Sequence, residues 1–202
     1  MAIITANNQS MTAITSLPSG VSAKSLILLA TETASSSATI SFTSNIDDTY
    51  KEYVFKFYDV LPASEGQFTF QADTGTNTSY NQTITSSSFR AYNYESSGTP
   101  TVAYYANGDL AQSTSFHYLT SNAGVGDDND QSFSGTLVLY DPSNSTFVKH
   151  FTCVTNSYGP SDYTMQYFAA GYFNTTTALT RVQFKFSSGN TDSGTIKMYG
   201  VA

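Results

Sequence analysis

The feature that most constrains the fold is an alternating aromatic run at residues 50–60, which reads Tyr-Lys-Glu-Tyr-Val-Phe-Lys-Phe-Tyr-Asp-Val. Successive side chains of a β-strand point to opposite faces, so Tyr53, Phe55 and Phe57 share one face. That face is aromatic and suits a core, whereas the other face is mixed. Pro62 has no backbone N–H to donate, so strand pairing is expected to end near it. The run predicts a long strand in the middle of a half-buried sheet.

The same alternation returns at residues 181–186, and similar short runs occur along most of the chain. Turn signals rich in Gly, Pro, Asn and Asp separate these runs. We therefore expect an all-β fold, an antiparallel β-sandwich that is jelly-roll-like, with about ten strands and little helix. The expected strands lie at residues 25–31, 38–43, 50–60, 67–72, 89–94, 101–106, 135–141, 147–155, 163–171, 179–187 and 195–201.

Two local predictions concern how particular segments fold. Residues 25–31 and 38–43 are expected to form a hairpin across the turn at residues 34–37. Residues 109–119 are the one segment that suggests a helix. Asp109 would be its N-cap, and Leu110, Phe116 and Leu119 would lie roughly on one side.

The length of 202 residues suits one large domain with an arm. The first twenty residues are rich in Ser, Thr and Asn, and Pro18 and Gly20 mark a turn before the first strand. We expect residues 1–24 to be an N-terminal arm and residues 25–202 to be a single β-sandwich domain. The arm has two interpretations, a disordered tail or a strand added to a neighbour's sheet.

Charged residues make up only 11% of the chain, and Ser, Thr, Asn and Gln take their place. A polar but weakly charged surface does little to keep monomers apart, which favours a subunit of an assembly. The net charge of −7 and the lack of Lys and Arg runs exclude a nucleic-acid partner. The apolar block at residues 26–30 is too short to cross a bilayer, and the N-terminus lacks the basic region of an export signal. We therefore expect no membrane insertion and synthesis in a cytoplasm.

No cofactor or metal is expected. Asp127, Asp128 and Asp130 could gather oxygen ligands around calcium, but the EF-hand spacing is absent, so a solvated loop is the preferred interpretation. The single cysteine, Cys153, cannot form an internal disulfide and is expected to be buried. His150 lies three residues before Cys153, on the opposite face of a strand, which argues against a zinc site.

The chain has no catalytic motif, because a Gly-x-Ser-x-Gly elbow and a phosphate-binding glycine loop are both missing and nothing places two carboxylates across a cleft. We expect a protein that is not an enzyme. Its 15 Tyr and 14 Phe, together with many amides, would suit sugars, although most of these aromatic residues occupy core-facing strand positions. Tyr92, Tyr94, Tyr104 and Tyr105 lie near weak strands and loops and are the candidates for a glycan-binding surface.

Four segments carry a resemblance to a known family. They are Tyr-Lys-Glu-Tyr-Val-Phe-Lys-Phe at residues 50–57, Asp-Leu-Ala-Gln-Ser at 109–113, Phe-Val-Lys-His-Phe at 147–151 and Ser-Gly-Thr-Ile-Lys-Met-Tyr-Gly-Val at 193–201. Together they resemble virion structural proteins of tailed bacteriophages, tail-fibre-like or capsid-decoration-like, especially those of phages of marine bacteria. The resemblance runs from about residue 25 to the end, and that family has no catalytic motif to carry over.

The resemblance implies a structural subunit exposed on the surface of a phage particle, as a capsid decoration or a component of the tail or its fibres. The expected location is the virion, after synthesis in the bacterial host cytoplasm. Its expected partners are other virion proteins and further copies of the chain, which would form a homo-oligomer. Two alternatives stay open: a receptor-binding module that recognises a host-surface glycan, and a polysaccharide hydrolase.

Overall fold

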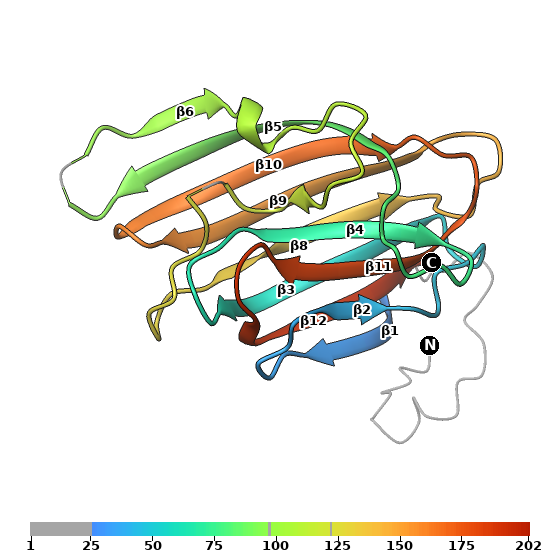
Figure 1. The fold of residues 1–202 in the computed structure, drawn as a ribbon, viewed down its shortest axis with the longest axis horizontal. Helices are drawn as coiled ribbons and strands as arrows, with labels where there is room; N and C mark the ends of the chain where they lie inside the picture. Colours follow the sequence, from blue (N-terminus) through green and yellow to red (C-terminus); the bar gives the residue numbers. More distant parts are fainter. Residues whose placement is uncertain (1–25, 97, 122) are drawn as a thin grey trace, which may run out of the picture.

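The computed structural model describes residues 26–96, 98–121 and 123–202, so the expected arm at residues 1–24 lies outside the described residues. The described chain forms two antiparallel sheets packed against each other, which confirms the predicted all-β sandwich (Figure 1). Besides the short 3-10 helix η1 (Ala106–Gly108), its elements are β1 (Leu26–Thr33), β2 (Ile40–Phe42), β3 (Glu52–Pro62), β4 (Phe68–Thr74), β5 (Ile84–Tyr94), β6 (Thr101–Tyr104), β7 (His117–Tyr118), β8 (Phe133–Tyr140), β9 (Lys149–Gly159), β10 (Tyr163–Phe173), β11 (Leu179–Phe186) and β12 (Thr191–Val201). Within these residues no helix is long and apolar enough to span a membrane.

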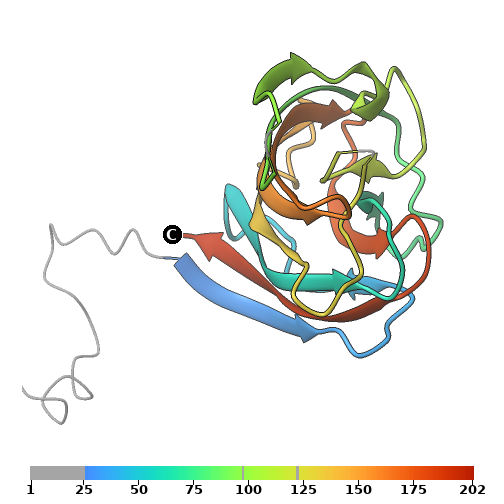
Figure 2. The same ribbon diagram turned by 90° about the vertical axis from the view of Figure 1, so that its left-hand side faces the viewer.

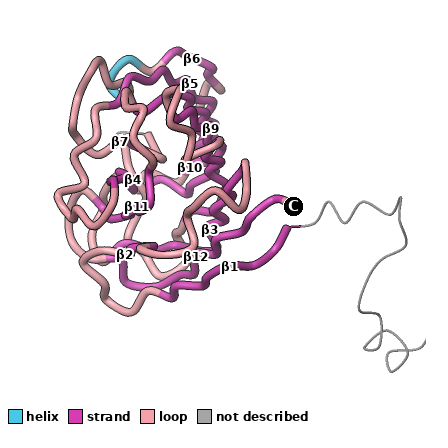
Figure 3. Tube along the Cα trace, turned by 90° about the vertical axis from the view of Figure 1, so that its right-hand side faces the viewer, coloured by secondary structure: helices cyan, strands magenta, loops and turns pink. Residues whose placement is uncertain are grey.

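The strand order is that of a jelly roll with two insertions. The larger sheet has the order β1-β12-β3-β8-β9-β10-β5-β6, and the smaller sheet has the order β2-β11-β4-β7. Without the hairpins β5–β6 and β9–β10, the remaining eight strands form two four-stranded sheets between which the chain crosses repeatedly, as in a jelly roll. Figure 3 shows the two layers from the side. The two hairpins enlarge one sheet only, and these four strands are called the extension below.

Phenylalanine rings fill the space between the sheets. Phe184 of β11 is fully buried, and its ring centroid lies 5.4 Å from those of both Phe55 and Phe57 of β3. Phe184 also stacks on Phe68 of β4 at 5.8 Å. The aromatic face predicted for residues 50–60 is therefore core, and β3 lies inside the larger sheet, between β12 and β8. Pro62 ends β3, as its missing N–H predicts.

The predicted hairpin of residues 25–31 and 38–43 is wrong. β1 pairs with β12 and β2 pairs with β11, so the two segments belong to different sheets. The turn between them carries the chain across the sandwich, where the N–H of Ala34 donates to the carbonyl of Gly194 and Ser37 exchanges two backbone hydrogen bonds with Thr191. A turn signal marks a change of direction, but it does not say which strand the next segment pairs with.

The predicted helix at residues 109–119 is also wrong. Ser113 exchanges two backbone hydrogen bonds with Ile84 of β5, and the carbonyl of Leu110 accepts one from the N–H of Ser86. Asp109 is not the N-cap of a helix: it follows η1 as its C-cap residue, and its carboxylate accepts hydrogen bonds from the hydroxyls of Ser88 and Tyr104. Bonding to β5 satisfies backbone groups that a helix would have satisfied internally.

Candidate functional site

The extension presents a surface on the outside of the larger sheet whose outward strand positions carry no charged residue. Buried and exposed residues alternate along β9, and the strand register carries this alternation through β10, β5 and β6. Although the chain has a net charge of −7, none of the outward positions is Asp, Glu, Lys or Arg. This surface, called the outer face below, comprises His150, Thr152, Val154, Asn156 and Tyr158 on β9, Thr164, Gln166, Phe168, Ala170 and Tyr172 on β10, Thr85, Ser87, Phe89, Ala91 and Asn93 on β5, and Val102 and Tyr104 on β6.

A ridge of large side chains crosses the middle of the outer face. Val154, Phe168, Phe89 and Tyr104 occupy the same level on four neighbouring strands. The rings of Phe89 and Phe168 stack with their centroids 4.5 Å apart and their planes inclined by 10°. Phe89 nevertheless remains 46% exposed and Tyr104 66% exposed. Exposed apolar groups gathered in one place mark interaction surfaces.

Two shallow hollows flank this ridge. The first has a volume of about 330 Å³, and the second, on the other side of the ridge, has a volume of about 390 Å³. Outer-face residues with amide or hydroxyl groups line both. Those of the first hollow are Asn93, Asn156, Thr164 and Gln166, and those of the second are Thr85, Ser87, Thr152 and Tyr172.

Asn156 is held in one orientation beside the first hollow. Its Nδ2 donates to Oγ1 of Thr164 at 2.8 Å and to the carbonyl of Met165 at 3.4 Å. A carboxamide has two N–H donors and one oxygen acceptor, so both donors are used within the protein. The Oδ1 atom of Asn156 is therefore an oriented acceptor.

The four tyrosines predicted to bind glycan do not share one surface. Tyr104 lies on the outer face, and its hydrogen bond to Asp109 raises the pKa of its phenol. Tyr92 and Tyr94 lie on the opposite face of β5 with their ring centroids 5.8 Å apart, beside a separate hollow of about 300 Å³. Tyr105 is buried, and the guanidinium of Arg90 lies 4.4 Å from its ring centroid.

Phe89, Phe168 and Asn156 form part of a surface that the sequence did not predict. Phe89 was placed at the start of a strand, but its exposure depends on which face of the extension is covered. The sequence signal for this surface is the lack of charged residues at every second position of β9 and β10. The outward residues are His150, Thr152, Val154, Asn156 and Tyr158 on β9 and Thr164, Gln166, Phe168, Ala170 and Tyr172 on β10.

Asp127, Asp128 and Asp130 lie in an exposed loop before β8. Gln131 closes this loop, because its N–H donates to the carbonyl of Asp128 at 2.9 Å and its Oε1 accepts from the N–H of Asp128 at 3.2 Å. Over the part of the chain that the structure describes, no group of three or more His, Cys, Asp or Glu side chains could hold a metal ion. Cys153 is buried, as predicted, and burial raises the pKa of its thiol.

The phenol of Tyr158 interacts with two carboxylates, Asp162 and Glu95, near the turn between β9 and β10. The hydroxyl of Tyr158 donates to Asp162 at 3.3 Å, and the pKa of this phenol is raised to about 12 by desolvation first and then by the charges of Asp162 and Glu95. A glycoside hydrolase needs two carboxyl groups on either side of the scissile bond. Here both carboxylates interact with the same phenol.

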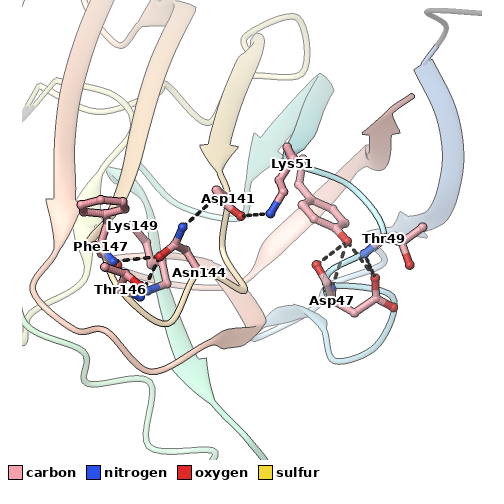
Figure 4. A network of polar contacts seen from close by, with 9 residues as sticks. Asp47, Thr49, Lys51, Asp141, Asn144, Thr146, Phe147 and Lys149 are labelled. Atoms are coloured by element: carbon pink, nitrogen blue, oxygen red, sulfur yellow. Dashed lines mark hydrogen bonds and ion pairs between the residues drawn. The ribbon is translucent and has the colours of Figure 1, made fainter.

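A network of polar contacts holds the loops that border β3 and β8 (Figure 4). Lys51 forms an ion pair with Asp141 at 2.9 Å, and Asn144 donates a hydrogen bond to the same carboxylate. These two contacts, the one from Asn144 first, lower the pKa of Asp141. The ammonium of Lys149 donates to the carbonyls of Phe147 at 2.7 Å and Thr175 at 3.2 Å. Because its members bind one another, we interpret the network as stabilising these loops and not as a ligand site.

β1 forms the open edge of the larger sheet. It pairs with β12, and the described chain supplies no strand on its other side. Figure 2 shows β1 at the margin of the sandwich. Leu26, Ile27 and Leu28 are 43%, 39% and 52% exposed, and because they are consecutive they project from both faces of the strand. This stretch contains neither the Lys nor the Pro with which proteins commonly protect open edges.

Comparisons of the chain with protein-family models, with curated proteins and with solved structures found no match. The functional interpretation therefore rests on two surfaces of the molecule, the edge of β1 and the outer face.

Proposed function

We propose that this chain is a non-enzymatic structural protein of a tailed-phage virion, exposed on the particle surface as a capsid decoration or a component of the tail or its fibres. It is made in the bacterial host cytoplasm and assembles by docking with other virion proteins and with copies of itself. The four segments quoted above support the virion assignment. Jelly rolls recur in viral capsid and lectin domains, so the fold agrees with the proposal by analogy.

The observation that carries the docking mechanism is the exposed apolar edge of β1. Fully burying a Leu or Ile side chain contributes about 1.5–3 kcal/mol, and a strand laid beside β1 would also pair its open backbone groups. A second β1 related by a two-fold axis would join two larger sheets edge to edge, with the same patch on both subunits. The low content of charged residues reduces repulsion between such copies.

Replacing Leu28 with lysine is expected to abolish self-association, because the contact would then bury a charge on each subunit without a partner. Sedimentation velocity should show an oligomer for the wild type at a concentration of about 100 μM and a monomer for Leu28→Lys, a weakening of roughly tenfold or more in Kd.

Val102→Lys is the matched control, because Val102 is an exposed apolar residue on β6, at the opposite edge of the same sheet. This variant is expected to associate like the wild type. A monomeric wild type, or an equal loss in both variants, would remove β1 from the docking mechanism.

The virion assignment is tested by quantitative mass spectrometry of gradient-purified particles of the phage that encodes this chain. A structural subunit is expected at a constant number of copies per particle. If the chain is found in lysates of infected cells but not in purified particles, it is not a virion protein.

A further inference from the structure

We propose that the outer face of the extension binds a neutral oligosaccharide, a function separate from subunit docking. The proposal rests on three properties of this surface: the absence of Asp, Glu, Lys and Arg from its outward strand positions, its stacked aromatic ridge and the amide and hydroxyl groups on both sides of the ridge.

The charge distribution selects for a neutral ligand. The outward positions of β9, β10, β5 and β6 carry no Asp, Glu, Lys or Arg, whereas the outward positions of β3 include Glu52 and Lys56. The whole chain is acidic, with a net charge of −7, so its long-range field repels acidic polysaccharides. A neutral glycan experiences no such repulsion, and its binding releases no counterions.

The ridge supplies rigid apolar contact. The 4.5 Å separation of the Phe89 and Phe168 rings is close to the spacing of neighbouring strands, so both rings stand upright on the sheet. Each ring covers one face of the other, and the second faces of Phe89 and Phe168 turn toward Tyr104 and Val154 on the flanking strands. The C–H groups of a sugar ring can pack on the exposed top of the ridge that these four side chains form. Because the rings already hold each other in place, little side-chain entropy is lost on binding.

The hollows supply oriented polar groups. Sugar hydroxyls both donate and accept hydrogen bonds, so uncharged amides and hydroxyls satisfy them without the desolvation of a charge. In the first hollow the oriented Oδ1 of Asn156 is an acceptor, and the carboxamide of Gln166 on the neighbouring strand lies on the same face. In the second hollow Thr85, Ser87 and Thr152 contribute hydroxyls. A mainly apolar surface with a few placed polar groups is typical of small-molecule sites.

The dimensions favour an oligosaccharide over a monosaccharide. The outer face of β5 runs from Thr85 to Asn93, which corresponds to roughly 27 Å at about 3.4 Å per residue. The two hollows lie on opposite sides of the ridge along this direction. A chain of several sugars could therefore cross the ridge and occupy both hollows.

An array of neutral oligosaccharides, with uronic-acid and sialic-acid oligosaccharides as the charged arm, tests this proposal on the full-length protein. Binding is expected on neutral glycans only, and isothermal titration with the strongest of them gives Kd. Phe168→Ala and Phe89→Ala are each expected to weaken binding about tenfold or more through loss of apolar contact at the ridge. Asn156→Ala should weaken sugar binding by a similar factor through loss of the Oδ1 acceptor, although the aromatic ridge of this variant is intact.

Phe147→Ala is the matched control, because Phe147 is a 67% exposed phenylalanine outside the outer face. It is expected to bind like the wild type, and thermal unfolding of each variant shows that it is folded. Absence of binding to every neutral glycan, preference for acidic glycans, or unchanged affinity in Phe168→Ala would overturn the proposal. If the wild type binds no sugar and forms an oligomer that Phe168→Ala disrupts, the outer face contacts a second copy of the chain instead. Absence of the chain from phage particles would remove the proposed function and leave glycan binding standing.

Discussion

Replacing Phe184 with alanine is expected to lower the free energy of unfolding by about 3–5 kcal/mol, the cost of removing a buried phenylalanine from a core that cannot fully collapse. Phe184 is fully buried and contacts phenylalanine rings from both sheets. Its removal therefore opens a cavity where the two halves of the sandwich meet. Urea unfolding followed by circular dichroism should show a lower midpoint with an unchanged dependence on urea concentration.

The matched control for Phe184 is Phe147→Ala, which truncates the same side chain at an exposed position. Surface substitutions of this kind usually change stability by less than about 0.5 kcal/mol. A loss of similar size in both variants would contradict the assignment of Phe184 to the centre of the core.

Acidification from pH 6.5 to pH 4 is expected to destabilise the protein by on the order of 3 kcal/mol through His117 alone. The His117 imidazole is fully buried between the rings of Phe70 and Phe151, and burial lowers its pKa from 6.5 to about 4. Between these two values the unfolded chain binds a proton that the folded chain does not. The contribution of the buried His117 to the free energy of unfolding is therefore fully present above pH 6.5 and is lost as the pH falls toward 4. Urea titrations at a series of pH values would measure this loss.

His117→Phe is expected to remove most of this loss, because a phenyl ring in the same apolar site does not titrate. His150→Gln is the control, because it removes an exposed histidine and leaves the buried His117 imidazole, and with it the loss between pH 6.5 and 4, in place. The carboxylates of Asp47 and Asp141 have lowered pKa values, so their contribution disappears below about pH 4, outside this window. A wild-type stability that is flat between pH 6.5 and 4 would contradict the buried neutral imidazole.

Alternation of aromatic residues was enough to predict the core side of β3 and β11, because both strands lie where the two sheets overlap. The same signal could not identify Phe89 as exposed. Phe57 and Phe89 both occupy alternating strand positions, but the smaller sheet covers the inner face of β3, and nothing in the described chain covers the outer face of β5. Sequence periodicity shows which residues share a face, and topology decides which face is buried.

The tyrosines predicted to bind glycan also show that a sequence pattern does not determine which residues are buried. Tyr104 and Tyr105 are neighbours in the sequence, yet Tyr104 is 66% exposed and Tyr105 is 5% exposed. Their different fates follow from the end of β6, where the chain turns into η1 and directs Tyr105 toward Tyr167 in the interior. The strand ends and crossings that produce this arrangement depend on long-range pairing, which local patterns do not specify.

A cryo-electron microscopy map of the phage particle that encodes this chain tests the central claim most directly. We predict density for the jelly roll on the outside of the particle, with β1 buried against a second copy or another virion protein and with the outer face turned to solvent. A particle surface without this density, or a subunit whose β1 edge contacts nothing, would contradict the account.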